Sequence, residues 1–340
     1  MVFPGYLADR SHGGFRVAYA AHSEVCVDDG DGTTMRAGGV VHKQQTLAEK
    51  VTCRGKGLHS GANVSLTLRP GRANTGVTFV RTDLGGVEIP ARPASVCSMY
   101  RATTLGGGKE SVATVEHLLG ALYALEVDNV RVEVDGPEIP VLDGSAAPFV
   151  ELIRTAGVFQ QAELRPRLRI LEPVEVVDGD RRIRVEPCED FAIRYMIEFA
   201  HPAIRRQEFA LDSVTAESFE HELARARTFG FLDEVAALRE VGLGRGGDLD
   251  NTVVLDDSRV INPGGLRFAD EFVRHKALDL VGDLALLGVG IEGLVSVERG
   301  GHALHQRLVS AILSQPSASE WIGATPQALR LTREVATAGG

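Results

Sequence analysis

The chain has 340 residues, of which 44% are hydrophobic and 24% are charged, and this ordinary balance excludes a largely disordered protein. Its 46 acidic residues outnumber 36 lysines and arginines, and the resulting net charge of −10 does not favour nucleic-acid binding. We see no apolar run near the ~18 residues of a membrane span and no secretory signal pattern. We therefore expect a cytoplasmic protein of about two domains.

The first half of the chain reads mainly as strands. Residues 1–42 lack a hydrophobic period and are rich in Gly and Asp, so we expect a flexible extension there. Polar and apolar residues then alternate as in half-buried strands, over 63–69, 76–81 and 129–135. Two helices are predicted at helical spacing, over 114–125 with Thr114 as N-cap and over 148–156 with Gly157 as its end.

The second half repeats this order of strands followed by helices. Strands are expected over 169–177, 181–186, 191–199 and 252–255, and helices over 217–226, 232–240, 270–287 and 302–313. The polar stretch 161–168 is expected to link a first domain, 43–160, to a second, 169–320, with a frayed tail at 321–340. The repeated order predicts an α+β fold of two similar lobes.

The helix predicted over 270–287 carries the most informative polar residues. On a wheel of about 100° per residue, His275, Lys276, Asp279 and Asp283 lie opposite a broad apolar face. Burial of such charges costs several kcal/mol per ion unless they are paired or bind a metal. The spacing of His275 and Asp279 fits one shared cation. A His275–Asp279 salt bridge, with Lys276–Asp283 as a second pair, is the alternative that this helix leaves open.

Glu116 and His117 fall in the first turn of the helix predicted over 114–125. Alone, they are an acid at the positive end of a helix and an ordinary polar histidine. Combined with His275 and Asp279, however, His117 completes a set of three protein ligands of the kind that leaves a catalytic zinc site open to water. Glu116, beside the ligands but not one of them, could then accept a proton from that water.

Three other residues are weaker candidates for a site. His302 follows Gly300 and Gly301, which allow close approach to a ligand, although a solvent-facing loop histidine fits equally. Thr228 is a possible donor to an oxyanion, or else a capping threonine. His59 lies in a tight glycine-flanked loop and is a candidate for lining a site.

Short motifs that run in order over about residues 43–315 match one known family. They include Gly55-Lys-Gly-Leu-His-Ser-Gly61, Ala102-Thr-Thr-Leu105, Thr114-Val-Glu-His-Leu118, Asp143-Gly-Ser-Ala-Ala-Pro-Phe149, Arg225-Ala-Arg-Thr-Phe-Gly-Phe231, Glu271-Phe-Val-Arg-His-Lys276 and Gly301-His-Ala-Leu304. On these motifs the chain resembles the UDP-3-O-acyl-N-acetylglucosamine deacetylase (LpxC) family of lipid A biosynthesis. The resemblance implies helices sandwiched between two β-sheets, with the active site between two α+β lobes.

The resemblance also implies a reaction and roles for individual side chains. The reaction is hydrolysis of the N-acetyl group of UDP-3-O-((R)-3-hydroxyacyl)-N-acetylglucosamine, with release of acetate. The resemblance implies that His117, His275 and Asp279 bind Zn²⁺ and that Glu116 is the general base. His302 would be the general acid or a cationic stabiliser, with Asp283 to orient it. Thr228 and Lys276 would contact the substrate or the oxyanion, and His59 and Phe229 would bind substrate.

The acyl chain of such a substrate needs an apolar passage. We expect it in the second lobe, with Leu232, Val235 and Leu249 as candidate lining residues. We expect a monomer whose partner is the UDP-linked acylated glucosamine, without nucleic acid, without a transmembrane segment and with at most peripheral contact with a membrane. Two rival hypotheses remain: a zinc amidohydrolase that acts on a different acylated sugar or a peptide, and a binding module whose buried polar face is merely structural.

Overall fold

The computed structural model describes residues 27–28, 34–36 and 39–323. The chain divides into two compact units, residues 1–41 and 42–340. In the first unit three short strands form an antiparallel sheet: β1 (Val27–Asp28), β2 (Thr34–Arg36) and β3 (Gly39–Val41). Most of the expected extension 1–42 and of the expected tail 321–340 lies outside the described residues, so both stay predictions.

The second unit contains a five-stranded sheet near its N-terminal end. The order of its strands is β5 (Val51–Lys56), β6 (Asn63–Pro70), β11 (Val130–Val134), β7 (Val77–Arg81) and β8 (Val87–Pro90). Strands β11 and β7 are parallel and the other neighbours are antiparallel. The alternation read from the sequence is confirmed, because Val64, Leu66 and Leu68 of β6 are buried.

A seven-stranded sheet follows later in the chain. Its strands are β13 (Arg167–Ile170), β14 (Val174–Asp178), β15 (Arg181–Glu186), β16 (Phe191–Glu198), β17 (Arg206–Leu211), β20 (Gly290–Glu298) and β21 (Ser319–Ile322). Strand β20 is central and pairs with β13, β15 and β16. The single strand expected over 169–177 is two strands, because Pro173 between them has no N–H to continue the ladder.

The stretch 161–168, expected as a linker, is largely strand. It forms the end of β12 (Val158–Leu164), which pairs with β4 (Lys43–Leu47), and the start of β13. Arg165, between the two strands, is buried and pairs with Glu126 and with Asp128. The charged residues Arg165 and Arg167 of this stretch therefore pair with carboxylates elsewhere in the fold. The division into two domains stays a prediction.

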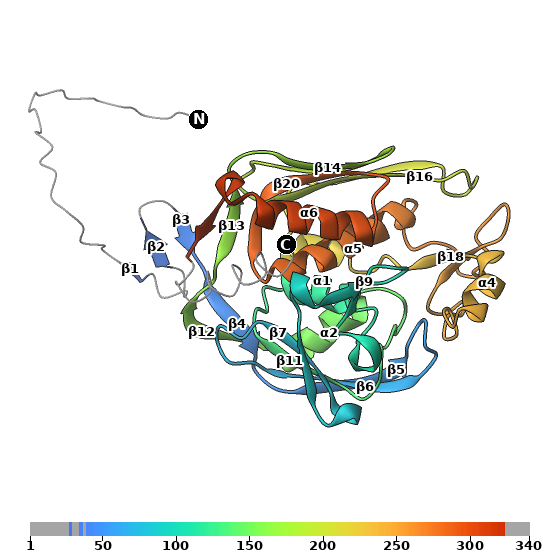
Figure 1. Ribbon diagram of the computed structural model, residues 1–340, viewed down its shortest axis with the longest axis horizontal. Coiled ribbons are helices and arrows are strands. Elements are labelled where there is room, and N and C mark those ends of the chain that lie inside the picture. Colours follow the sequence, from blue (N-terminus) through green and yellow to red (C-terminus); the bar gives the residue numbers. More distant parts are fainter. Residues whose placement is uncertain (1–26, 29–33, 37–38, 324–340) are drawn as a thin grey trace, which may run out of the picture. The chain divides into compact units, whose positions relative to one another are not determined.

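Four helices lie between the two sheets (Figure 1): α1 (Glu116–Ala124), α2 (Ala147–Ala156), α5 (Glu271–Leu284) and α6 (His302–Ser314). Helix α1 packs on α5, and α6 packs on α5 and β14. The smaller elements are α3 (Ala216–Glu222), α4 (Glu234–Glu240), and the parallel pair β18 (Phe229–Phe231) and β19 (Val253–Leu255). The architecture confirms the predicted α+β class. Within the described residues, the helices are too short or too polar to cross a membrane.

The contact between α1 and α5 is close, and Gly282 permits it. A Cβ on Gly282 of α5 would lie 2.0 Å from the main-chain oxygen of Glu116, which begins α1. A Cβ on Gly120 of α1 would meet its nearest neighbour, the nitrogen of Gly282, at an ordinary 3.5 Å. The backbone of Glu116 therefore rests directly on α5, and this contact brings the polar residues of both helices together.

Candidate metal centre and active site

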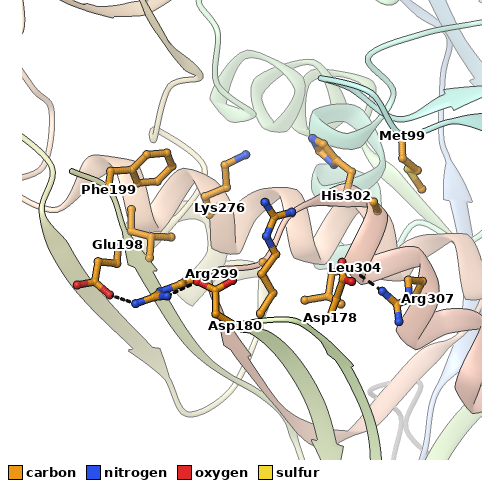
Figure 2. A pocket seen from close by; sticks show the side chains of 15 residues that line it. Met99, Asp178, Asp180, Glu198, Phe199, Lys276, Arg299, His302, Leu304 and Arg307 are labelled. Carbon is orange, nitrogen blue, oxygen red and sulfur yellow. Dashed lines mark hydrogen bonds and ion pairs between the residues drawn. The ribbon is translucent and has the colours of Figure 1, made fainter. Parts of the chain in front are cut away.

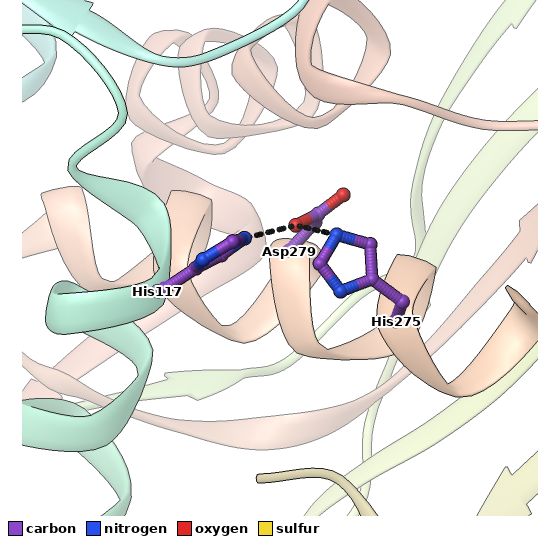
Figure 3. A group of neighbouring side chains, drawn as sticks. All are labelled: His117, His275 and Asp279. Atoms are coloured by element: carbon purple, nitrogen blue, oxygen red, sulfur yellow. Dashed lines mark ion pairs between the residues drawn. The ribbon is translucent and has the colours of Figure 1, made fainter. Parts of the chain in front are cut away.

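Side chains of α1 and α5 form a buried group that could hold a metal ion (Figure 3). His117 comes from α1, and His275 and Asp279 lie one turn apart on α5, as the sequence spacing predicted. One ligand atom from each residue lies within 4.8 Å of the other two. The nearest carboxylate oxygen, Asp279 Oδ1, is 3.7 Å from His117 Nε2 and 3.4 Å from His275 Nε2.

The chemistry of this group fits a cation. Burial lowers the pKa of His117 to about 3 and also lowers the pKa of His275, so both rings are neutral. His275 Nδ1 bonds the main-chain oxygen of Ala226 at 3.1 Å, which places its proton there and leaves the Nε2 lone pair free. Asp279 Oδ1 is buried without a hydrogen-bond partner in the described part of the chain. An orphaned carboxylate oxygen between two neutral nitrogens is a donor set for a divalent metal such as zinc.

Asp279 is ionised even though it is buried. Burial alone would raise its pKa, but His275 and Lys276 outweigh that effect and hold the pKa well below its usual range. Lys276 Nζ donates to Asp279 Oδ2 at 2.9 Å. The alternative pair Lys276–Asp283 is therefore not formed, because Asp283, one turn further along α5, faces α6 instead.

Glu116 and His302 lie beside the three candidate ligands, and the pKa of each is raised by its surroundings. Burial raises the pKa of Glu116 to about 8. Burial alone would lower the pKa of His302, but Asp283 and Asp279 outweigh it and raise that pKa to about 9. His302 Nε2 is 3.9 Å from Glu116 Oε1 and 3.8 Å from Asp279 Oδ2. A carboxyl group that titrates near neutral pH and an imidazolium able to give a proton thus face the same space.

The carboxylate of Asp283 is held by three side chains. Its Oδ2 lies 2.8 Å from His302 Nδ1 and 2.8 Å from His305 Nδ1, and its Oδ1 accepts from Thr103 Oγ1 at 2.5 Å. Burial would raise the pKa of Asp283, yet its histidine partners lower it to about 2. The sequence predicted the pairing of Asp283 with His302. It missed His305, three residues after His302 on α6, and Thr103, which lies in a loop and was included only within the motif Ala102-Thr-Thr-Leu105 without a role of its own.

Thr114, two residues before α1, is strained, and a buried carboxylate holds it. Thr114 does not cap the helix as predicted: its φ is +59°, and its hydroxyl donates to Glu138 Oε1 at 2.8 Å. Glu138 also accepts from the main-chain nitrogens of His59 and Ser60. This carboxylate therefore ties the 57–61 loop to the segment that delivers Glu116 and His117, and the hydroxyl of Thr114 is used for that tie instead of a cap.

His59 lies at the edge of this arrangement. Burial lowers the pKa of His59, so its ring is neutral. Its Nδ1 faces the main-chain nitrogen of Gly244 at 3.4 Å, and its Nε2 is buried without a partner in the described residues. The ring therefore has one nitrogen that is free for a ligand.

A buried ion pair anchors the loop that carries Thr228. Arg227 Nε donates to Glu271 Oε1 at 2.8 Å, and the main-chain nitrogen of Arg227 donates to the same oxygen. Glu271 begins α5, so this pair ties the start of that helix to the segment containing Ala226, the partner of His275. Thr228 precedes β18 and does not sit at a helix N-terminus, which removes the alternative that it is a capping residue.

A cavity of about 450 Å³ opens beside His302 and Lys276 (Figure 2). Basic and acidic side chains share its wall. The basic ones are Arg181, Lys276, Arg299 and Arg307, and the acidic ones are Asp178, Asp180 and Glu198. Arg299 pairs with both Asp180 and Glu198, and Arg307 pairs with Asp178. The cavity thus places a strongly polar wall beside His302 and Lys276.

The expected apolar passage is only partly assembled. Phe229 packs edge-on against Phe272, with ring centroids 5.0 Å apart, and lies 6.3 Å from the ring of His275. Leu232 and Leu249 are large exposed hydrophobic residues, and Val235 lies on α4, which has no buried residue. Phe229 is therefore brought to the site, whereas the passage assigned to Leu232, Val235 and Leu249 stays a prediction.

Known proteins similar to this chain share one activity in their names. The family model for UDP-3-O-acyl N-acetylglycosamine deacetylase (LpxC) matches residues 44–314. The UDP-3-O-acyl-N-acetylglucosamine deacetylase of Anaeromyxobacter sp. (strain Fw109-5) is 47% identical over 285 residues, which are 84% of this chain and 93% of that protein. Proteins of the same name from Geobacter sp. (strain M21) and Nitratidesulfovibrio vulgaris are 48% and 46% identical, over 84% and 87% of this chain and 93% and 98% of their own lengths.

Proposed function

The chain belongs to the UDP-3-O-acyl-N-acetylglucosamine deacetylase family, and we propose that it removes the N-acetyl group of UDP-3-O-((R)-3-hydroxyacyl)-N-acetylglucosamine in lipid A biosynthesis. The observation that carries this proposal is the shared space between three metal-ligating atoms, the carboxyl group of Glu116 and the imidazolium of His302. Hydrolysis of an amide needs an electrophile, a base and an acid, and these groups are of the right kinds for all three tasks.

His117, His275 and Asp279 would hold the metal, for which we propose Zn²⁺. When bound there, the ion supplies positive charge that polarises the amide carbonyl and eases deprotonation of water. The two neutral histidines and the ionised Asp279 give the site a net charge of −1 before binding, which favours a divalent cation. The Ala226 oxygen keeps His275 in the tautomer that binds.

Glu116 acts as the general base in this proposal. It takes a proton from water as the water oxygen forms a bond to the acetyl carbonyl carbon. Without the metal, burial raises the pKa of Glu116 to about 8 and favours its protonated form at neutral pH. The positive charge of a bound cation would favour the ionised carboxylate, which is the form that accepts a proton. The main-chain nitrogen of Thr103 donates to Glu116 Oε2 at 3.1 Å. This bond holds Oε2 away from the reaction and leaves Oε1 to face His302.

His302 acts as the general acid. Its pKa of about 9 keeps the ring protonated at neutral pH, and its Nδ1 donates a hydrogen bond to Asp283. The proton on Nε2 is therefore available to the nitrogen of the leaving amine as the C–N bond breaks, which gives acetate and the free amino sugar. Lys276 and Thr228 are proposed to contact the substrate or the developing oxyanion.

The polar cavity beside His302 supports binding of the nucleotide part of the substrate. Arginine and lysine recognise a diphosphate well. Of the four basic side chains on the wall, Arg299, Arg307 and Lys276 are paired with carboxylates, so a diphosphate would replace some of these partners. His59 and Phe229 are proposed to contact the sugar and acyl parts, with the passage near Leu232, Val235 and Leu249 for the chain itself. The cytoplasmic location and the monomeric state stay predictions from the sequence.

The direct test is release of acetate from UDP-3-O-(3-hydroxyacyl)-N-acetylglucosamine before and after chelation. We expect activity that is lost on chelation and restored by added zinc. The same acyl sugar without UDP serves as the comparison substrate. Equal rates on both sugars would favour a zinc amidohydrolase of different specificity. A folded protein that binds no metal and releases no acetate would contradict the proposal and favour a binding module.

Replacement of His275 by alanine is expected to remove tight metal binding. The variant loses one of three donors, while its backbone stays in the middle of α5. We expect less than about one tenth of the wild-type zinc content after dialysis, since loss of a primary ligand costs more than the 10- to 100-fold typical of outer partners. Metal analysis of the purified protein measures this. One equivalent of tightly bound zinc in the variant would disprove the ligand assignment.

A further inference from the structure

A buried histidine that the proposed reaction does not use lies directly behind the general acid. His305 has no exposed surface, and its ring bonds two groups. Its Nδ1 is 2.8 Å from Asp283 Oδ2, and its Nε2 is 3.0 Å from the hydroxyl of Tyr195. Tyr195 is itself buried in β16, on the sheet that covers α6. Four side chains therefore form one chain of hydrogen bonds: Tyr195, His305, Asp283 and His302.

The direction of each bond in this chain follows from the chemistry of the groups. Asp283 is ionised and only accepts, so His305 must donate from Nδ1. Burial lowers the pKa of His305, so the ring is neutral and its Nε2 accepts from the hydroxyl of Tyr195. The two histidines that share Asp283 Oδ2 thus differ: Nε2 of His305 is taken by Tyr195, whereas Nε2 of His302 faces Glu116 and Asp279.

These contacts restrict Asp283 to one orientation. Thr103 holds Oδ1, and His305, which does not line the cavity beside His302, holds Oδ2. Rotation of the carboxylate about its side-chain bond would break both. His302 then finds its Nδ1 acceptor in a fixed place, and its Nε2 stays 3.9 Å from Glu116 Oε1 and 3.8 Å from Asp279 Oδ2.

We propose that His305, supported by Tyr195, is a positioning residue for the general acid: it fixes the carboxylate of Asp283 so that His302 keeps its Nε2 proton directed at the leaving amine. The inference rests on the proposed deacetylase function. It assigns His305 no contact with substrate, because His305 is not among the residues that line the cavity. Its loss should therefore lower kcat and leave KM nearly unchanged.

The group Asp283, His302 and His305 also has the spacing of a metal site, but its bonds are those of a proton network. Both Nδ1 atoms contact the same carboxylate oxygen at hydrogen-bond distance, and Nε2 of His305 is taken by Tyr195. Each polar atom of His305 already has a partner, so a metal would have to displace existing bonds. The positioning role accounts for these contacts without a further ligand.

The test compares His305→Leu with His305→Asn. Leucine removes both hydrogen bonds, whereas the amide nitrogen of asparagine can take the place of Nδ1 and restore the donor to Asp283. We expect His305→Leu to lower kcat for acetate release about 10- to 100-fold with KM within about twofold of wild type, and His305→Asn to recover most of that loss. Rates are divided by the concentration of folded, zinc-containing protein, so that a change in yield does not alter the measured kcat.

A second pair of variants keeps the test decisive if His305→Leu does not fold. Tyr195→Phe removes only the hydroxyl that supports His305, and we expect kcat to fall about threefold without a change in KM. The matched control is Tyr123→Phe, which removes a hydroxyl that accepts from the main-chain nitrogen of Ile291 at 2.9 Å. Tyr123 is on α1 but outside the hydrogen-bond chain, so its variant should keep the wild-type kcat.

The outcomes separate this inference from the proposed function. A wild-type protein that releases no acetate contradicts the function itself. An active wild type combined with unchanged kcat in His305→Leu and Tyr195→Phe contradicts the positioning role alone. Equal losses in His305→Leu and His305→Asn would also overturn it, because the restored donor would then have had no effect.

Discussion

Replacement of Glu116 by glutamine should lower kcat for acetate release by about 10²- to 10⁴-fold, the range of general acid–base catalysis. Glutamine has nearly the same shape and can still accept from the main-chain nitrogen of Thr103, which now bonds Glu116 Oε2 at 3.1 Å. It cannot take a proton from water at neutral pH. Because Glu116 is not a metal ligand in the proposed site, zinc content should stay at the wild-type level.

Steady-state rates and metal analysis on the same preparation check this prediction. Glu292→Gln is a suitable control, since Glu292 is also a largely buried carboxylate but pairs with Arg167 and Arg169 on the seven-stranded sheet. The control should keep the wild-type kcat. Full activity in Glu116→Gln would remove the residue from the role of base, and loss of zinc in that variant would show that it helps to hold the metal.

Replacement of Gly282 by alanine should damage both stability and activity. The new Cβ would lie 2.0 Å from the main-chain oxygen of Glu116, so α1 and α5 must move apart. Overpacking of this kind costs about 1–3 kcal/mol in the free energy of unfolding. The shift also separates Glu116 and His117 from the ligands on α5, and a misplacement of about 1 Å can cost 10²-fold in rate.

The matched control for this variant is Gly120→Ala, at the same helix contact. Its Cβ would have ordinary neighbours at 3.5 Å and beyond, and alanine is favoured over glycine within a helix by up to about 1 kcal/mol. Thermal unfolding and kcat/KM should therefore show a large loss for Gly282→Ala and none for Gly120→Ala. The same Tm and activity in Gly282→Ala as in wild type would contradict the close contact between the helices.

Much of the fold could be predicted because local patterns dominate it. The period of two in β6 and β11 and the apolar face of α5 are set by residues close in sequence, and Gly157 ends α2 as expected. The prediction failed where the local structure depends on a partner that is distant in the sequence. The stretch 161–168 looks like a linker until Arg165 meets Glu126 and Asp128 across the fold. Likewise, Thr114 was assigned as a cap because Glu138, its actual partner, could not be placed beside it.

The site was predictable to the extent that its residues share a helix. Asp279 and Asp283 fall on the polar side of α5 at a spacing that a helical wheel shows directly. Thr103 could not be found in this way, since a single hydroxyl in a loop carries no pattern. His305 did leave a signal, because it follows His302 by three residues on α6 and so shares its face. Only the three-dimensional structure shows that both histidines meet one carboxylate.

The close contact of α1 with α5 also has a consequence for the order of events during biosynthesis. The three proposed metal ligands stand at positions 117, 275 and 279, so a nascent chain exposes His117 long before the other two leave the ribosome. Until then, the first helix presents one isolated imidazole, which holds zinc weakly. On the proposed ligand assignment, metal loading has to wait until four fifths of the polypeptide has been synthesised and the two helices have met. Tight zinc binding would then report that α1 and α5, which come from distant parts of the sequence, have packed together.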